Sequence, residues 1–319
     1  MPAIVTKGAF SAQGFGFTYK AAGGPTGTVG IFALGCNGCG NYATARDKYT
    51  FATGSVSAGA VASKKSQAGS ATGSATKGIF ALGTYQNAPG GCIATSERNK
   101  YTYACDSSAA AASASTCSSG GGAAAGNSTR GIFQIGATLN TRNKYTYSSD
   151  TNASATAASL SNQYGSAAGN STRGIFSLGC ACGPKNTRNK YTYACDANAS
   201  ASAASFASFA GSAAGNSTRG IFALGYNACY SRTSSRDKYT YSSDTNASAT
   251  ASSSAAVYGY AAGNSLLGIF TLGNVVGIGA TTTRNKYTYA CDANASTTAS
   301  TANTQRGSAA SNGTCGVNV

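Results

Sequence analysis

The chain has 319 residues, of which 42% are hydrophobic and 10% are aromatic, with 19 Tyr, 12 Phe, one Met and no Trp. Its formal net charge is +15, because 23 Lys and Arg stand against eight Asp and Glu, and it contains no His. The lack of His excludes the usual general base for a Ser or Cys nucleophile and excludes imidazole metal ligands, and the regular recurrence of Tyr and Phe excludes a disordered low-complexity chain.

The N-terminal segment, residues 1–20, has no charged region followed by an apolar stretch. No run in the chain approaches the length of a transmembrane helix. We therefore expect a protein that is made in the cytoplasm and that does not insert into a membrane. Residues 7–10 and 16–19 are degenerate copies of the two motifs that dominate the rest of the chain.

Two motifs alternate from residue 30 onward. Gly-Ile-Phe begins at Gly30, Gly78, Gly131, Gly174, Gly220 and Gly268. Lys-Tyr-Thr-Tyr, or Phe at its last position, begins at Lys48, Lys100, Lys144, Lys190, Lys238 and Lys286, with spacings of 44 to 52 residues. With the Asn-Ala-Ser and Gly-Ser-Ala-Ala-Gly segments between copies, each unit offers four strand-sized pieces. A period in the forties with four short strands predicts a β-propeller blade.

The residue types assign positions to these strands. The Ser-Ala-Ala-Gly segment has almost no bulk, so we expect it to be the innermost strand, where neighbouring sheets converge. Alternation in the Lys-Tyr-Thr-Tyr strand puts its tyrosines on one face, where they would pack between blades. The Asp that follows each such strand, as in Asp106 or Asp150, predicts a turn into the outermost strand.

The two ends of the chain predict closure of a ring. Residues 311–319 match the start of another unit, and residues 1–20 hold the degenerate motifs. Strands from 1–20 and 303–319 would complete one composite blade and remove the open sheet edges of a repeat array. The prediction is an all-β, seven-bladed propeller of four-stranded blades forming a single domain over residues 1–319, with six blades as the alternative.

Gly-Ile-Phe-Ala-Leu-Gly, Arg-Asn-Lys-Tyr-Thr-Tyr and Gly-Asn-Ser-Thr-Arg, in that cyclic order, resemble the Kelch-like β-propeller repeats of phage tail-associated and uncharacterised bacterial proteins. The resemblance covers nearly the whole chain. It implies a virion component of a bacteriophage, such as a tail or fibre protein made in the host cytoplasm, that touches a host surface. A cytoplasmic protein is the alternative localisation.

Catalysis is not expected. All eight acidic residues stand at repeat-locked positions beside the Lys-Tyr strand, which indicates turn formers and charge partners and not a local acidic cleft. Cys36-Asn37-Gly38-Cys39 and Cys180-Ala181-Cys182 have spacings used by metal or redox sites, but they belong to different blades, so we expect neither metal nor cofactor. Cys105, Cys195 and Cys291 read as small strand-end residues, and Cys92 and Cys229 are candidates for intermolecular disulfides.

The basic residues are the first candidates for binding. One repeated set would form a circular band on the ring: Arg98, Lys100, Arg142, Lys144, Arg188, Lys190, Arg236, Lys238, Arg284 and Lys286. A second, partial ring would come from Lys77, Arg130, Arg173 and Arg219. Such bands would dock on an anionic surface, whereas the alternative is solvated side chains whose stems cover the tyrosines. No aromatic-interleaved basic cluster indicates sequence-specific nucleic-acid binding.

The loops after each Gly-Ile-Phe strand differ most between copies and would present the binding surface: residues 36–45, 84–97, 137–141, 180–187, 226–235 and 274–283. The leading hypothesis is a non-enzymatic structural or attachment protein that binds other virion proteins or an anionic host-surface glycan, with homo-oligomerisation left open. The alternative is a lectin-like propeller whose Tyr85, Tyr226 and Tyr230 line sugar pockets.

Overall fold

The computed structural model describes residues 28–37, 41–87, 91–114, 120–180 and 183–313. These residues form an all-β protein built of many short antiparallel strands, and they contain no helix. Correspondingly, no described helix is long and apolar enough to cross a membrane.

The described residues contain six four-stranded antiparallel sheets, here numbered in chain order. Sheet 1 consists of β1 (Val29–Ala33), β2 (Arg46–Thr50), β3 (Val56–Gly59) and β32 (Ser308–Ser311). Sheet 2 consists of β5 (Ser70–Gly73), β6 (Lys77–Ala81), β9 (Arg98–Thr102) and β10 (Ser107–Ala111). Sheet 3 consists of β11 (Ala123–Gly126), β12 (Arg130–Gln134), β13 (Arg142–Thr146) and β14 (Thr151–Ala155).

The second half of the chain repeats this pattern. Sheet 4 consists of β15 (Ser166–Gly169), β16 (Arg173–Ser177), β17 (Arg188–Thr192) and β18 (Ala197–Ala201). Sheet 5 consists of β20 (Ser212–Gly215), β21 (Arg219–Ala223), β23 (Arg236–Thr240) and β24 (Thr245–Ala249). Sheet 6 consists of β26 (Tyr260–Gly263), β27 (Leu267–Thr271), β30 (Arg284–Thr288) and β31 (Ala293–Thr297).

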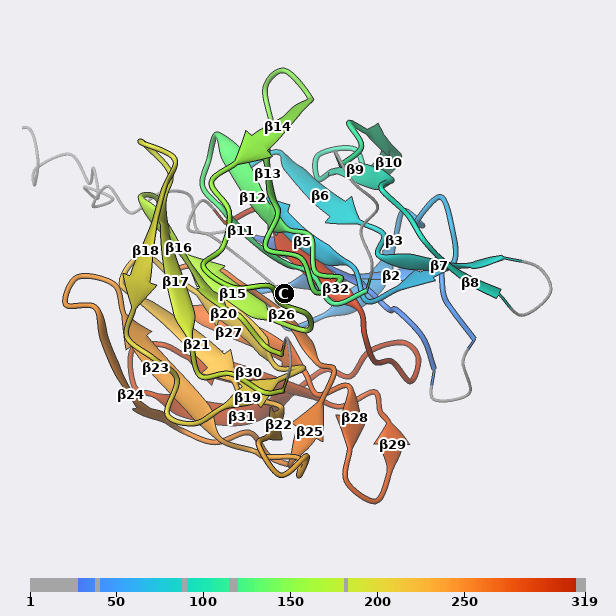
Figure 1. Cartoon of the computed structure of the whole chain (residues 1–319). Coiled ribbons are helices and arrows are strands. Elements are labelled where there is room, and N and C mark those ends of the chain that lie inside the picture. The colour runs from blue at the N-terminus through green and yellow to red at the C-terminus, as the bar shows by residue number, and fades with distance from the viewer. Residues whose placement is uncertain (1–27, 38–40, 88–90, 115–119, 181–182, 314–319) are drawn as a thin grey trace, which may run out of the picture.

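In three smaller sheets, the segment just before the innermost strand of a unit pairs with the segment between the second and third strands of the same unit. One consists of β4 (Ser66–Gln67), β7 (Thr84–Asn87) and β8 (Gly91–Ala94). Another consists of β19 (Ser208–Phe209) and β22 (Tyr226–Asn227). The third consists of β25 (Ala256–Val257), β28 (Asn274–Val275) and β29 (Gly279–Ala280), whose hairpin projects from the body of the molecule (Figure 1).

The four-stranded sheets fan around a common centre, and the small-residue strands lie innermost, as predicted (Figure 1). The innermost strands contact one another in a closed circuit, from β5 to β11, β15, β20, β26, β32 and back to β5. Every residue of these strands is buried. Apart from Tyr260, these strands contain only Ala, Ser, Gly and Thr, because neighbouring inner strands approach each other closely.

Tyrosines fill the space between successive sheets. The first Tyr of each Lys-Tyr-Thr-Tyr strand is fully buried, as predicted. In five of the six copies its hydroxyl group donates to the Asp in the following turn, as Tyr145 does to Asp150, whereas the Tyr49 hydroxyl pairs with Thr297. The turn aspartates confirm their predicted role, since Asp106, Asp150, Asp196, Asp244 and Asp292 all adopt a positive φ of 49° to 54°. Asp tolerates this conformation better than most residues do.

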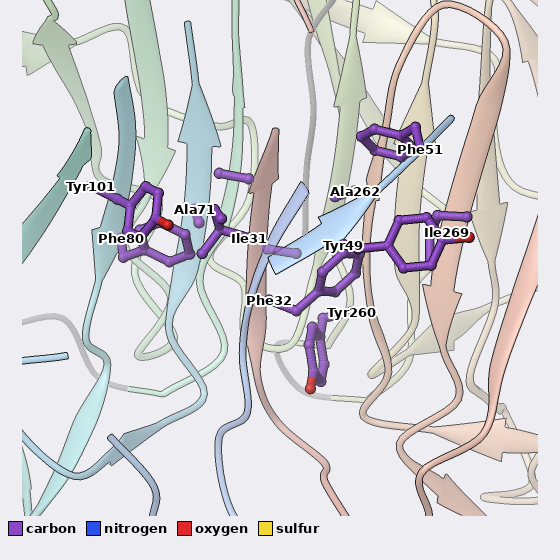
Figure 2. Close-up of a cluster of buried hydrophobic side chains, with 12 residues drawn as sticks. Ile31, Phe32, Tyr49, Phe51, Ala71, Phe80, Tyr101, Tyr260, Ala262 and Ile269 are labelled. Carbon is purple, nitrogen blue, oxygen red and sulfur yellow. The ribbon is translucent and has the colours of Figure 1, made fainter. Parts of the chain in front are cut away.

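The C-terminal strand completes the first sheet. β32 pairs antiparallel with β1, with Ile31 opposite Ala310, so the two ends of the described chain share sheet 1. Buried side chains of sheet 1 form one cluster with side chains of sheets 6 and 2. This cluster includes Phe32 of sheet 1, Ile269 of sheet 6 and Phe80 of sheet 2 (Figure 2). β32 pairs with β1, whereas residues 1–20, which the predicted composite blade includes, lie outside the described residues, so their part in that blade stays a prediction.

The described residues contain six four-stranded sheets, and because residues 1–27 and 314–319 lie outside them, both the seven-bladed prediction and the six-bladed alternative stay predictions. The first unit obtains its inner strand from the C-terminal part of the chain. The Gly30-Ile31-Phe32 copy takes that strand from Ser308–Ser311. Of residues 311–319, which were predicted to begin a further unit, Ser311 belongs to β32 and residues 314–319 lie outside the described residues.

Candidate binding face

The arginines of the predicted basic band do not lie on the surface of the protein. Arg98, Arg142, Arg188, Arg236 and Arg284 are at most 2% exposed, and so is Arg46, the member of this set that the sequence prediction left out. A guanidinium group enclosed between two sheets cannot reach a partner. The prediction that these arginines bind an anionic surface is therefore wrong.

Each of these arginines instead joins one sheet to the next. The guanidinium of Arg142 in sheet 3 lies 4.5 Å from the ring centre of Phe176 in sheet 4 and donates to Asn189 and Asn198 of that sheet at 3.4 and 2.8 Å. The same stack recurs at every interface, with ring distances of 4.3 to 4.6 Å, and the last, Arg284 over Phe32, connects sheet 6 to sheet 1. Burial lowers the pKa of Arg142 to about 10, which leaves its charge intact at neutral pH.

The lysines of the predicted band are ion-paired across the same interfaces. Lys144 of sheet 3 lies 3.0 Å from Asp196 of sheet 4, and Lys48, Lys100, Lys190 and Lys238 make the equivalent pairs with Asp106, Asp150, Asp244 and Asp292. Their charges are neutralised in place, so they do not support the predicted docking band either. Lys286 differs, because no carboxylate of the described residues lies within 4 Å of it.

All eight acidic residues of the chain take part in ion pairs, each with a different basic residue. Five of these pairs have been named. The other three are Lys64–Glu97 and the two buried pairs Arg188–Asp237 and Arg284–Asp47, in which an Asp stands where the other interfaces have an Asn. The other Lys and Arg side chains in the part of the chain that the structure describes have no carboxylate within ion-pair distance.

The second predicted basic ring is also largely structural. Arg130, Arg173 and Arg219 donate to the backbone carbonyl oxygens of Tyr193, Tyr241 and Tyr289 in the following sheets, at 2.9 to 3.1 Å, and Lys77 makes the same contact with Tyr147. These side chains remain half-buried. Their main role in the fold is to cap strand-end carbonyls across an interface.

One end of the fan carries a ring of six backbone groups. The N–H groups of Ala68, Gly121, Tyr164, Ala210, Tyr258 and Arg306 each donate to the carbonyl of the preceding member, at 2.6 to 2.9 Å, and the circuit closes from Ala68 to Arg306. All six residues have a positive φ. They line a shallow depression together with the glycine that follows each of them.

The side chains around this depression differ in size from one side to the other. Ala68 and Gly121 leave one side open, whereas Tyr164, Tyr258 and Arg306 fill the other. The guanidinium of Arg306 lies 4.4 Å from the ring centre of Tyr258, which in turn contacts Tyr164 at 5.7 Å. Burial alone would lower the pKa of Arg306, but its hydrogen bond with Tyr258 outweighs this effect and the pKa lies above its usual value.

The aromatic contacts continue outward from the depression. Tyr226 lies 5.9 Å from Tyr258 and stacks on Phe209 at 5.0 Å, and Phe209 contacts Tyr230 at 5.6 Å. Tyr230 is 64% exposed. Two of the three predicted loop tyrosines, Tyr226 and Tyr230, therefore lie together, while Tyr85 stands apart on β7 beneath the ammonium group of Lys64 at 4.4 Å.

The predicted variable loops lie around the same depression. Each loop pairs with a residue that lies one or two positions before a member of the backbone ring: Cys36 with Gln305, Thr84 with Gln67, Leu139 with Asn162, Cys180 with Gln163, Tyr226 with Phe209, and Val275 with Ala256. We call this end of the molecule, formed by the six loops and the six ring residues, the axial face. Sequence reasoning missed Tyr164, Tyr258 and Arg306, although their position varies sharply between otherwise regular copies.

The cysteines do not assemble a metal site among the described residues. No group of three or more Cys, Asp and Glu there could hold a metal ion. Cys36, Cys92, Cys105, Cys180, Cys195, Cys229 and Cys291 are free thiols, and Cys39 and Cys182, the partners in the two spaced motifs, lie outside the described residues. Cys92 and Cys229 are exposed, so the predicted intermolecular disulfides stay a prediction.

Together the sheets and their common centre define a β-propeller-like all-β protein. Among solved structures the chain is similar to that of YjhT, with a TM-score of 0.63 and 11% sequence identity over 86% of this chain and 98% of that chain. At this identity the likeness concerns the fold alone. No protein-family model matches the chain, and no curated protein matches it.

Proposed function

We propose that the protein is a non-enzymatic binding module that attaches to its partner through the axial face. The six sheets would be the complete set of blades of a closed propeller, with β32 as the closing strand. The loops on this rigid frame would then supply the contacts, as loops on repeat scaffolds commonly do.

The distribution of exposed apolar side chains carries this proposal. Among the described residues, eight large hydrophobic side chains are exposed. Seven of them belong to the axial loops or to the segments packed beside these loops: Val61, Ile93, Leu139, Leu160, Tyr230, Val276 and Ile278. Only Leu266 belongs to a turn at the opposite end of its sheet. Apolar groups gathered on one end of a soluble frame are typical of an interaction surface.

The charges on the axial face favour an anionic partner. Lys185, Arg232 and Arg306 lie there, and no carboxylate of the described residues is within ion-pair distance of any of them. The acids nearest to these loops are already engaged, since Glu97 pairs with Lys64 and Asp47 and Asp237 are buried. An acidic surface would therefore meet basic and apolar groups together.

A lectin-like function is the second candidate, and the exposed Tyr230 favours it. Its ring projects beside the stacked Phe209 and Tyr226, which offers an aromatic platform of the kind that sugar rings pack on. A glycan with acidic groups would satisfy both the platform and the charge of the face. A protein partner would use the wider apolar surface instead.

Glycan-array binding of the intact protein tests the axial face directly. We expect acidic glycans to bind, and Tyr230→Ser to weaken this binding about tenfold, as loss of an exposed aromatic contact does. Leu266→Ser is the matched control, because it removes an exposed apolar side chain from the opposite end. Equal binding by the two variants would contradict the proposed face, and binding of neutral glycans only would contradict the charge argument.

The proposal that the protein is a component of a virion rests on the resemblance of its repeats, and a separate experiment tests it. Purified virus particles should contain the chain at a fixed, stoichiometric copy number. Its absence from them would remove the attachment role in a virus and would leave a cytoplasmic binding module.

A further inference from the structure

Five of the six interfaces between sheets build the same carboxylate pocket. At the interface of sheets 3 and 4, Asp196 accepts hydrogen bonds from Lys144, from the Tyr191 hydroxyl and from the backbone N–H of Thr156. The other four pockets hold Asp106, Asp150, Asp244 and Asp292 with equivalent donors. The pattern of three donors around one carboxylate is thus a repeated part of the fold.

The sixth interface, between sheets 6 and 1, lacks the carboxylate. Gly54 stands where the other units have Asp, and it adopts the same positive φ, 69° against 49° to 54°. A side chain at this position would have room, since the nearest atoms to an added Cβ are the Tyr49 hydroxyl at 3.5 Å and the Thr297 hydroxyl at 3.8 Å. The acidic group is therefore absent from a place that could hold it.

The donors at this interface are present. Lys286 stands opposite Ile269 in the same register as Lys238 opposite Ile221, and it has no carboxylate within 4 Å among the described residues. Thr298 follows Thr297 at the end of β31, as Thr250 follows Ala249 at the end of β24, and Thr250 donates its N–H to Asp292. No described backbone carbonyl accepts the equivalent N–H of Thr298.

The two hydroxyl groups beside Gly54 complete the set. Tyr49 and Thr297 form a hydrogen bond of 2.6 Å with each other, so one of the two hydroxyl protons is left to donate elsewhere. In the five other sheets the residue at the Thr297 position is Gly or Ala, as in Ala249. Thr297 thus adds a donor to the one pocket that has no acid of its own.

We propose that this seam pocket, formed by Lys286, Thr298, Thr297, Tyr49 and Gly54, binds an external carboxylate. The bound group would occupy the place that the Asp side chain takes in the other five interfaces. It would be a free carboxylate or the side chain of an Asp or Glu presented by another molecule. This site is separate from the axial face and does not depend on the function proposed for it.

Thermal unfolding with small carboxylates tests the pocket in the intact chain. Replacing sodium chloride by sodium acetate at constant ionic strength should raise the Tm of the wild-type protein by roughly 2 °C at saturation. Acetyl-aspartyl-amide, used in the same way, presents a side-chain carboxylate in a peptide. A rise with acetate alone supports a site for free carboxylates, and a rise with both supports a site that also accepts acidic side chains.

Two variants separate this pocket from general anion binding to a basic protein. Gly54→Asp supplies the internal carboxylate, so it should raise the Tm without ligand and abolish the response to acetate. Lys286→Met should also abolish the response, while Lys65→Met, which removes one exposed positive charge elsewhere, should keep it. The proposal is overturned if acetate has no effect on the wild type, or if Gly54→Asp and Lys286→Met respond to acetate as the wild type does.

Discussion

At the scale of single residues, the environment and not the residue type decides what a charge does in this protein. Arg142 and Arg306 are both stacked on an aromatic ring, yet Arg142 is sealed between two sheets and Arg306 opens onto a depression. The aspartates show the same principle. Burial alone would raise the pKa of Asp150, but Lys100, Tyr145 and the Ala112 N–H outweigh it and bring the pKa down to about 2.

These aspartates predict acid sensitivity. Asp150, Asp196 and Asp244 each have a pKa of about 2 in the folded protein, against about 3.9 when unfolded. A lowered folded-state pKa stabilises the fold above pH 4, and this stabilisation is lost as the pH falls from 4 to 2. We expect Asp150→Asn to reduce the free energy of unfolding by roughly 1 to 2 kcal/mol at pH 7 and by much less at pH 2.

Denaturant unfolding at pH 7, 4 and 2 measures this difference. Ser149→Ala, next to Asp150 in the same exposed turn, is the control and should show no dependence on pH. A loss for Asp150→Asn that is the same at pH 2 as at pH 7 would show that the carboxylate charge does not stabilise the interface.

At the scale of strands, glycine and tyrosine depend on each other. A Cβ added to Gly174 on β16 would lie 2.9 Å from the Tyr193 hydroxyl and 3.0 Å from Ala125 of the neighbouring sheet. The glycine of each Gly-Ile-Phe motif therefore leaves room for the second tyrosine of Lys-Tyr-Thr-Tyr. The two motifs recur together because the tyrosine of one motif packs on the glycine of the other within the same sheet.

This packing predicts that a side chain added at the glycine of the Gly-Ile-Phe motif destabilises the fold. Gly174→Ala should lower the free energy of unfolding by roughly 1 to 3 kcal/mol because the interface is overpacked. Adding Tyr193→Phe removes the hydroxyl and should recover part of the loss. Gly59→Ala is the matched control, since an added Cβ on β3 meets nothing closer than 3.4 Å and the same position is Ala in other sheets. Equal losses at both glycines in chemical denaturation would contradict the packing argument.

The sequence was sufficient to predict the strands, because their periodicity and residue sizes reflect local packing that every unit repeats. It was insufficient for the binding residues, because burial depends on the neighbouring sheet. Alternation along Arg142-Asn143-Lys144 predicts two faces, but both faces of this strand are covered by other sheets, so the arginine that looked exposed is enclosed. Tyr258 and Arg306 come together only because the inner strands of sheets 6 and 1 are adjacent.

At the scale of the whole molecule, one short strand holds the two ends of the described chain together. β32 pairs with β1 and contacts β26 and β5, so it joins three sheets. A chain truncated after Gly307 should lose these contacts and expose the edge of β1. We expect its Tm to fall by roughly 10 °C or more, or the protein to aggregate.

Differential scanning calorimetry with size-exclusion chromatography measures this loss. A chain truncated after Gly313, which keeps β32, is the matched control and should unfold within a few degrees of the full chain. If the chain that ends at Gly307 unfolds at the temperature of the control, then β32 does not contribute to closure.

The arginine stacks also give the molecule a direction. Every guanidinium reaches forward, from its own sheet to the phenylalanine of the following one, so any single unit has an arginine side and a phenylalanine side that complement each other. An unclosed array of such units would leave one of each side unsatisfied at its two ends, and copies could then join head to tail into fibres. Bringing Arg284 over Phe32 within one chain satisfies both sides at once, and it thereby removes this route to polymerisation.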